Sequence, residues 1–522
     1  MSNLFHSING HGTIDKVVKN KLVRVYARWS STENNANNAW NVNFSNGNVN
    51  NNNKNNSNVV RPVCALEEEE IKGWIDAYFN CIKNKRTKPQ CNLYRMNYEE
   101  DLLRLAIEVN NGTYKPTTST CFIVTYPKYR EVFAAAFRDR IVQHWLMMRV
   151  EPYLEQRFRS QGDVSYNCRK GYGTLRANLR LRDEIERVSE NYTCNAWVGK
   201  YDIRSFFMSI DKSILMERLE EFLREVYREY DLEKVLWLLR IVIMHCPQDD
   251  CVRRSAPVLW ERLPKHKSLF NSDRNVGVAI GNITSQLLAN FYLSFFDEWV
   301  VEQCSKCGAG YVRFVDDWVV VAKDKQFILN LRKQADKWLR ENLKLTMHKD
   351  KDYIQHVSKG VKFVGQVIKP HRKYLNNGTI NRFLFRMKQT EETCRSITED
   401  GFTIQRAMEL DAHVCSLNSY MGFLCHANSY AIRRKAFERA KWFKKCCYLE
   451  GHFLKVKVKQ RYNFNNLLKY LEYGNQLVLR RRAAGARVRD AYRRASRIYH
   501  SGDGAKRRRK KRIQMVGSST RT

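Results

Sequence analysis

The pattern of apolar and polar positions divides the chain into three parts. Residues 1–65 and the segment after about residue 470 are polar, whereas the region between them has regular apolar periodicity. Apolar residues at helical spacing predict helices over 66–84, 98–109, 138–150, 175–188, 214–245 and 282–301. Alternating or continuous apolar runs predict strands over 121–126, 195–203, 311–315 and 318–322, and the chain after Pro370 is expected to be mainly helical. The pattern therefore predicts an α+β fold.

Three carboxylates lie in or beside these apolar strands. Asp316 and Asp317 separate two short strands at the spacing of a tight hairpin, and Asp202 lies near the end of another strand. A surface hairpin can also carry Asp-Asp at its turn, but the flanking strands here are too apolar for an exposed hairpin. Buried carboxylates are costly unless a cation neutralises them. Mg²⁺ prefers carboxylate oxygens, and two such ions can activate a 3′-hydroxyl and stabilise a leaving pyrophosphate.

The charge of the chain indicates a polyanionic partner. Lys and Arg number 91 against 54 Asp and Glu, a formal net charge of +37, and such a field favours nucleic acid. The 43% hydrophobic content excludes a wholly disordered basic protein. No apolar run reaches the roughly 18 residues of a membrane span, and the N-terminus lacks a secretory signal. The fifteen cysteines form no framework, so we expect reduced thiols, a cytoplasmic location and no membrane partner.

The two polar ends differ from each other in composition. Asn occupies 15 of the 25 positions in residues 34–58, which predicts a disordered spacer. Residues 480–512 carry 15 Lys or Arg against two Asp and end in KRRRKKR. A solvated tail is the plain interpretation of such a run, and a phosphate-binding arm is the one that we favour beside the other basic segments.

An ordered set of motifs resembles the reverse transcriptases. YDIRSFF (201–207), GVAIGNITSQ (277–286) and FVDD (314–317) follow one another in the order and spacing of that family. RDRIVQHWL and GYGT precede them, LTMHKDK and VKFVG follow them, and the resemblance covers about residues 66–430. It implies a right-hand polymerase. The expected regions are a disordered segment (1–65), fingers (66–195), a palm with the FVDD hairpin in an antiparallel sheet (196–370), a helical thumb (371–470) and a basic tail (471–522).

The resemblance also implies roles for individual residues. Asp202, Asp316 and Asp317 match the catalytic triad that binds two Mg²⁺ ions, with the Ile203 carbonyl as a further ligand. The residues that match nucleotide-binding positions are Lys128, Arg130, Phe207, Ile280, Gly281, Gln286 and Lys351, and those that match the primer grip are Phe363, Val364 and Gly365. Within the first set, Lys128 and Arg130 would hold the triphosphate, and Lys351 would lie near the leaving phosphates.

Phe207 is expected to select the sugar of the nucleotide. It stands five residues after Asp202, where reverse transcriptases place a bulky aromatic ring against the 2′ position. A 2′-hydroxyl would clash with the ring, so the product should be DNA. Phe206 and Phe207 could instead both be core residues.

The segment IGNITSQ (280–286) resembles the diversity-generating retroelement branch. Many other reverse transcriptases have Gln where this chain has Ile280, so a polar brace on the nucleotide is lost and errors at template adenines are expected. Residues 29–63 resemble the variable segment of target proteins of these elements, which suggests translated template; a plain linker is the alternative. The implied partners are an adenine-rich template RNA, a primer, dNTPs, the cDNA product and a small basic accessory protein, in a bacterial or phage-encoded system.

Two other interpretations remain open at this point. One is a retron-like or antiphage-defence reverse transcriptase, which the flanking DNA would distinguish. The other is a catalytically idle RNA-binding protein, against which the intact Asp202, Asp316 and Asp317 argue.

Overall fold

The computed structural model describes residues 13–18, 21–26, 38–42, 49–53, 68–83, 85, 89–126 and 128–463. The chain divides into two compact units. The first comprises Met1–Gly173, Arg187–Ser189 and Ala196–Ile354, and the second comprises Thr174–Glu186, Glu190–Asn195 and Gln355–Thr522. Among the described residues, none of the helices combines the length and apolar character needed to cross a membrane. The predicted basic tail lies outside the described residues.

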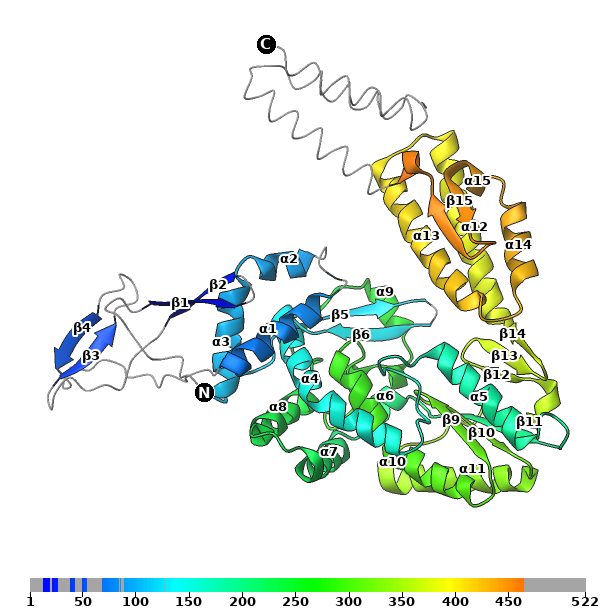
Figure 1. Ribbon diagram of the computed structural model, residues 1–522, viewed down its shortest axis with the longest axis horizontal. Coiled ribbons are helices and arrows are strands. Elements are labelled where there is room, and N and C mark those ends of the chain that lie inside the picture. Colours follow the sequence, from blue (N-terminus) through cyan, green and yellow to red (C-terminus); the bar gives the residue numbers. More distant parts are fainter. Residues whose placement is uncertain are drawn as a thin grey trace, which may run out of the picture. The chain divides into compact units, whose positions relative to one another are not determined.

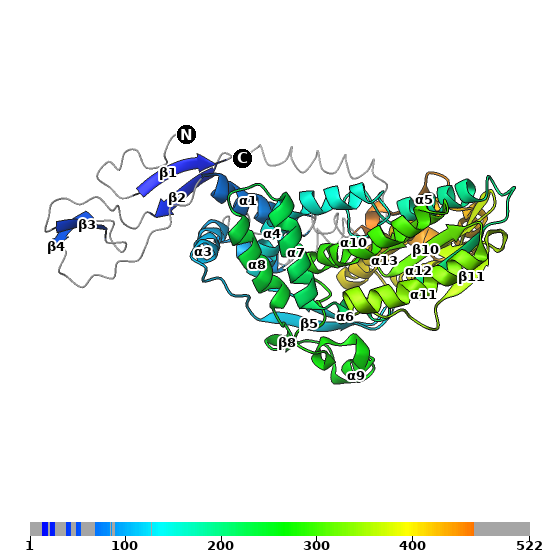
Figure 2. The ribbon, with the colours of Figure 1, turned by 90° about the horizontal axis from the view of Figure 1, so that it is seen from below.

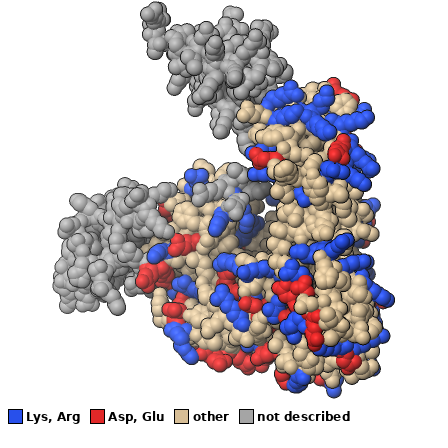
Figure 3. All heavy atoms as spheres, turned by 45° about the vertical axis from the view of Figure 1, so that its right-hand side comes forward, with Lys and Arg blue, Asp and Glu red and all other residues tan. Residues whose placement is uncertain are grey.

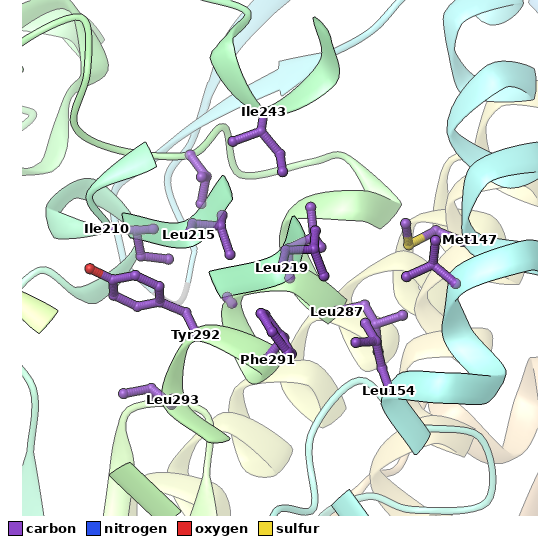
Figure 4. Close-up of a cluster of buried hydrophobic side chains, with 14 of the residues drawn as sticks. Met147, Leu154, Ile210, Leu215, Leu219, Ile243, Leu287, Phe291, Tyr292 and Leu293 are labelled. Atoms are coloured by element: carbon purple, nitrogen blue, oxygen red, sulfur yellow. The ribbon is translucent and has the colours of Figure 1, made fainter. Parts of the chain in front are cut away.

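Helices form most of the first unit (Figure 1). They are α1 (Glu68–Ile82), α2 (Pro89–Arg95), α3 (Tyr98–Asn110), α4 (Phe137–Ser160), α6 (Phe206–Ser209), α7 (Lys212–Val226), α8 (Leu232–Met244), α9 (Pro257–Glu261), α10 (Ile283–Ser305) and α11 (Lys325–Leu343). Figure 4 shows the core between α4, α7, α8 and α10, where Leu154, Leu219 and Phe291 are fully buried. Burial of each such side chain contributes roughly 1.5–3 kcal/mol, so this core anchors the sheet beside it.

The prediction of one long helix over 214–245 is wrong, because α7 ends at Val226 and α8 begins at Leu232. Asp231 precedes α8 and is buried. Its carboxylate accepts hydrogen bonds from Tyr227 Oη at 2.7 Å and Arg149 Nε at 2.6 Å. Apolar spacing alone could not reveal this break, since a partner of Asp231 lies on α4, far away in the sequence.

A four-stranded sheet lies beside this core, in the order β11-β7-β10-β9. Its strands are β7 (Trp197–Asp202), β9 (Gly310–Phe314), β10 (Asp317–Ala322) and β11 (Tyr353–His356), and β10 is antiparallel to both β7 and β9. One face packs against α10 and α11 (Figures 1 and 2): the Trp318 ring contacts Phe296 of α10, and Tyr201 Oη donates to the Ile328 carbonyl of α11. Because side chains alternate along a strand, Asp202 and Asp317 point to the opposite face.

A second, three-stranded sheet has the order β6-β5-β8. β5 (Ser119–Val124) is antiparallel to β6 (Arg130–Ala134) and parallel to β8 (Cys251–Arg253). β5 corresponds to the strand predicted over 121–126. The parallel strand β8 belongs to the segment between α8 and α10, and Glu131 of β6 joins that segment by accepting hydrogen bonds from Ser268 Oγ and Leu269 N.

The second unit contains a helical core and two small sheets. The helices are α5 (Thr174–Val188), α12 (Asn377–Glu399), α13 (Ile404–Leu424), α14 (Tyr430–Arg439) and α15 (Phe443–Cys446). One sheet has the order β12-β13-β14 (Val361–Phe363, Gln366–Lys369 and Arg372–Leu375), and β15 (Cys447–Glu450) pairs with β16 (Lys455–Val458). The expectation of a mainly helical region after Pro370 therefore missed three short strands, because four residues are too few to show an apolar period.

Basic side chains are prominent on the surface of this second unit (Figure 3). Exposed Lys and Arg residues follow one another along α14 and the segment after it: Arg434, Lys435, Arg439, Lys441, Lys444, Lys445 and Lys455. Part of the positive charge counted from the composition therefore lies on the surface of the second unit.

Four short strands are described within residues 1–65, for which disorder stays a prediction. β1 (Thr13–Val18) pairs with β2 (Lys21–Tyr26), and β3 (Asn38–Val42) pairs with β4 (Val49–Asn53) in antiparallel register. Backbone hydrogen bonds do not require apolar side chains, so a polar composition does not exclude strand pairs such as β1–β2 and β3–β4. The other positions of residues 1–65 lie outside the described residues.

Candidate active site

The three predicted aspartates come from two neighbouring strands and one turn. Asp202 ends β7 and lies directly opposite Asp317, which begins β10. Asp316 lies in the two-residue turn between β9 and β10, and its carbonyl accepts a hydrogen bond from the Ile203 N–H at 3.2 Å. Asp202 is only 8% exposed. Burial, followed by the negative charges of Asp202 and Asp317, raises the pKa of Asp316 to about 6.

Two lysines neutralise part of this negative charge. Lys351 Nζ lies 2.7 Å from Asp202 Oδ2, and Lys200 Nζ lies 3.1 Å from Asp317 Oδ1. The segment that carries Lys351 is held against the sheet because the His348 N–H donates to the Asp202 carbonyl at 2.8 Å. Sequence reasoning singled out Lys351 but missed Lys200. The available signal was its position two residues before Asp202, which places both side chains on the same face of β7.

The donor set fits a hard divalent cation. Within the described part of the chain, no three or more His, Cys, Asp or Glu side chains are grouped closely enough to hold a metal ion. Asp202 and Asp317 nevertheless supply, from one face of one sheet, the carboxylate oxygens that Mg²⁺ prefers, and Asp316 adds a carboxylate from the turn. Asp202, Asp316 and Asp317, with the Ile203 carbonyl, are therefore the groups that would hold such an ion.

Phe207 lies on the short helix α6, which follows β7, the strand that ends in Asp202. Its ring is partly buried, whereas the neighbouring Phe206 is only 2% exposed and belongs to the main core. The two ring centroids are 5.4 Å apart. The carbonyl of Phe207 accepts a hydrogen bond from Val278 N at 2.8 Å, so the backbone at this ring is fixed to the segment that carries Gly281.

A cavity of about 690 Å³ lies between β5, β6, α4 and the start of α10. Gly281 and Gln286 line it, together with the basic side chains of Lys85, Arg140 and Arg254. Two further lining groups, Gln143 Oε1 and Asn282 Oδ1, are buried without a protein hydrogen-bond partner. A cavity of this size accommodates a nucleotide-sized ligand, and these groups offer it positive charge and hydrogen-bond acceptors. Sequence reasoning gave no role to Arg140, Gln143 and Asn282, although they lie in motifs that it quoted, and it missed Lys85 and Arg254, which come from separate segments.

Comparison with known proteins assigns the domain that holds this site. Residues 118–368 match the family described as reverse transcriptase (RNA-dependent DNA polymerase). These residues form a reverse transcriptase domain. Protein YkfC of Escherichia coli (strain K12) is 23% identical over 314 residues, which cover 52% of this chain and 74% of YkfC.

Telomerase structures share low similarity with the chain. A truncated apo telomerase from Candida tropicalis is 13% identical, with a TM-score of 0.37, over 50% of this chain and 55% of the telomerase. The telomerase from Candida albicans in complex with a TWJ fragment of telomeric RNA is 11% identical, with a TM-score of 0.37, over 67% of this chain and 70% of that one. The present chain thus spans little more than half the length of the first of these telomerases.

Gly281 of the reverse transcriptase domain contacts β6 as well as lining the cavity. Its φ of +128° and its surroundings require glycine, because a Cβ atom would lie 2.4 Å from the Phe133 carbonyl oxygen. Gly281 therefore lies close to the backbone of β6. A hydrogen bond from Phe133 N to the Ile280 carbonyl at 2.8 Å holds the two segments together. Ile280 packs against a small apolar cluster that includes Phe133 and Ala279, and it does not line the cavity.

We expect Gly281→Ala to destabilise the domain. The new methyl group would press on the backbone of β6, which cannot give way as a flexible side chain would. Strain of this kind costs about 1–3 kcal/mol. Chemical denaturation would measure the loss, and Gly112→Ala is the matched control, since Gly112 also has a positive φ (65°) but a Cβ there would meet nothing within 4 Å. Equal losses for the two variants would show that contact with Phe133 is unimportant.

We expect His144, which also lines the cavity, to make stability depend on pH. Burial, with the positive charges of Lys85 and Lys170, lowers its pKa from the ordinary 6.5 to about 4. Below pH 6.5 the unfolded chain binds a proton that the folded chain does not, so stability falls between about pH 6.5 and pH 4. The contribution of His144 to the loss between pH 7 and pH 5 is at most about 2 kcal/mol, because the imidazole is partly exposed to solvent.

Urea denaturation at pH 7 and pH 5 would measure this loss. The difference in stability between pH 7 and pH 5 should be smaller in His144→Gln by the contribution of His144, whereas substitution of the exposed His426 by Gln should leave that difference unchanged. The same pH dependence in wild type and His144→Gln would contradict the assignment.

The remaining predicted residues lie at the end of the β5–β6 hairpin or in the second unit. Lys128 and Arg130 are exposed at the end of the β5–β6 hairpin and do not line the cavity. Phe363, Val364 and Gly365 belong to the second unit. Phe363 is buried there, and the Gly365 carbonyl accepts hydrogen bonds from Asn376 N and Thr379 Oγ1, both at 3.1 Å.

Proposed function

We propose that the protein is an RNA-directed DNA polymerase that extends a primer along an RNA template with dNTPs. The observation that carries this proposal is the pairing of Asp202 with Asp317, beside Asp316, in a reverse transcriptase domain. Phosphoryl transfer of this kind needs groups that bind metal ions and place the reactants, and it needs little covalent chemistry from the protein.

The side chains divide this work in the proposed mechanism. Asp202, Asp316 and Asp317 would hold two Mg²⁺ ions, which would lower the pKa of the 3′-hydroxyl and neutralise negative charge on the phosphates. Lys351, whose ammonium group lies beside Asp202, is within reach of a phosphate bound at these carboxylates. Phe207 excludes a 2′-hydroxyl. Lys128 and Arg130, both exposed, are free to hold the triphosphate.

The cavity beside Gly281 is the second part of the proposed nucleic-acid site. Its basic residues Lys85, Arg140 and Arg254 can bind phosphate, and the unpartnered amide oxygens of Gln143 and Asn282 can accept hydrogen bonds from a base. The ligand that fits this chemistry is a nucleotide of the template or the incoming dNTP.

We further propose that copying is error-prone at adenine, as in the diversity-generating retroelement branch. The support is Ile280, whose aliphatic side chain packs against apolar neighbours and offers no hydrogen bond to a nucleotide. An adenine-rich template RNA, a small basic accessory protein and a cytoplasmic site of action in a bacterial or phage-encoded system belong to this finer proposal. Sequencing the DNA that flanks the gene would test it, because a second gene with a matching variable repeat would support the branch and its absence would favour a retron-like element.

Primer extension tests the activity directly. The purified full chain would be incubated with an RNA template, an annealed DNA primer, dNTPs and Mg²⁺, and extension to the template end is the expected result. Failure with both Mg²⁺ and Mn²⁺, with and without added host extract, would contradict the polymerase proposal. Sequencing of the cDNA tests the finer one: equal error rates opposite all four template bases would contradict error-prone copying of adenine and leave the polymerase proposal standing.

A further inference from the structure

The turn that carries Asp316 is strained. It consists of Val315 and Asp316 between β9 and β10, and Val315 has a φ of 60°. This left-handed conformation is rare for residues other than glycine, and for a β-branched side chain it is an outlier. Such a conformation persists only where the surrounding structure holds it. The structure must therefore contain groups that keep this turn in place.

A buried arginine makes the contact that the turn requires. Arg313, two residues before Val315, donates from Nη1 to the Val315 carbonyl oxygen at 2.9 Å. The same guanidinium binds the Asp297 carboxylate in two places, from Nε to Oδ1 at 2.6 Å and from Nη2 to Oδ2 at 2.5 Å. Arg313 and Asp297 are 0% and 1% exposed. The guanidinium is thus fixed to α10 on one side and to the turn on the other.

Three more polar groups complete this cluster. Asn290 Oδ1 accepts a hydrogen bond from Arg313 Nη1 at 3.2 Å, and Tyr311 Oη donates to Asp297 Oδ1 at 2.7 Å. Ser165 Oγ donates to Asn290 Oδ1 at 3.4 Å. Each partner limits the movement of the guanidinium, so its position relative to the turn is well defined.

We propose that Arg313 is a positioning residue, which holds the Val315 carbonyl and thereby places Asp316 and Asp317 for metal binding. This inference rests on the proposed polymerase function. A planar guanidinium can bind a carboxylate bidentately and still donate to a carbonyl, whereas the single ammonium group of lysine cannot reproduce that geometry. A buried ion pair is also no more stabilising than a well-packed apolar pair, so stability alone does not account for the arrangement.

A double-mutant cycle between Arg313 and Val315 tests the proposal. The proteins are wild type, Arg313→Met, Val315→Gly and the double variant, and the measurements are kcat for nucleotide addition, the Kd for primer–template and the Tm. Arg313→Met should lower kcat by about 10- to 100-fold, the size expected for misplaced reacting groups, with the Kd changed less than about three-fold. In the Val315→Gly background, the fold-decrease in kcat that Arg313→Met causes should be at least about five times smaller. The reason is that glycine adopts a positive φ without strain, so the turn no longer needs the arginine.

A matched ion pair elsewhere in the first unit separates positioning from stability. Arg149 Nε lies 2.6 Å from Asp231 Oδ2, with Asp231 4% exposed, and neither residue touches the turn. Arg149→Met should lower the Tm while leaving kcat within about two-fold of wild type, as expected for a residue remote from the reacting groups. Arg313→Lys provides a second variant that keeps the charge if Arg313→Met does not fold, and it should also lower kcat.

The outcomes distinguish this inference from the proposed function. An unchanged kcat in folded Arg313→Met or Arg313→Lys would overturn it, as would an equal loss of kcat in Arg149→Met. Additive effects of Arg313→Met and Val315→Gly would also overturn it, because the turn would then not be the element through which Arg313 acts. An inactive wild type would instead contradict the polymerase function itself.

Discussion

Asp316→Asn is expected to abolish DNA synthesis while leaving the fold intact. The asparagine has the same size, so the turn between β9 and β10 can persist, but the side chain loses the charge that attracts a divalent cation. Asp202→Asn should have the same effect, since Asp202 lies directly opposite Asp317 in the sheet. We expect a loss of at least about a thousand-fold, because metal ions supply most of the charge stabilisation in this reaction.

Primer extension measures this loss, and binding of RNA by the same variants serves as the test of folding. The matched control is Asp183→Asn, which removes an exposed aspartate from α5. It should extend primers at the wild-type rate. Extension above a few per cent of wild type in the Asp202→Asn, Asp316→Asn double variant would exclude these carboxylates as the metal-binding groups.

Phe207→Ala is the second change with a large expected effect. Removing the ring should open space at the 2′ position of the incoming nucleotide and allow ribonucleotides to be added. Discrimination of this kind, by a steric clash, is worth at least about 1–3 kcal/mol, so selectivity for dNTPs over rNTPs should fall at least about 10- to 100-fold. Extension assays with each nucleotide type alone would measure the ratio of kcat/KM.

Phe206→Ala is the control for this prediction. The Phe206 ring is buried in the main core, so its removal should cost about 3–5 kcal/mol of stability without altering the choice of sugar. Phe207 is only partly buried, so Phe207→Ala should cost less stability and should alter the choice of sugar. Unchanged sugar selectivity in Phe207→Ala would mean that the ring serves packing alone.

The positions of the three aspartates could be predicted from the sequence because the pattern of a strand shows which residues share a face of the sheet. Apolar runs located the strands that carry Asp202 and Asp317, and antiparallel pairing then brings their ends together. The same alternation places Lys200, two residues before Asp202, on the same face of β7, so it could have been predicted as well. The helices α3 and α5 begin and end within a residue or two of their predicted bounds, because their apolar stripes are long and regular.

Contacts between distant positions could not be predicted in this way. Arg313 stands in an apolar strand without any local sign of its partner Asp297, which lies on another element 16 residues earlier. Gly281 was singled out as a nucleotide-binding residue, and its contact with Phe133 of β6 is one that only the folded chain reveals. The cavity was missed for the same reason, since its basic residues come from separate segments.

The parallel strand β8 has a consequence for the order in which a nascent chain can fold. β5 and β6 are close in sequence and can pair soon after they leave the ribosome. The third strand arrives much later, since Ser119 of β5 pairs with Cys251 of β8 and the hydrogen bond from Ile123 N to Ser255 Oγ, just after β8, also spans 132 residues. At ordinary rates of synthesis this interval is on the order of ten seconds, during which one edge of β5 lacks its partner. The hairpin with Lys128 and Arg130 therefore exists first as an incomplete sheet, and a chaperone or an RNA that protects that edge would act within this interval.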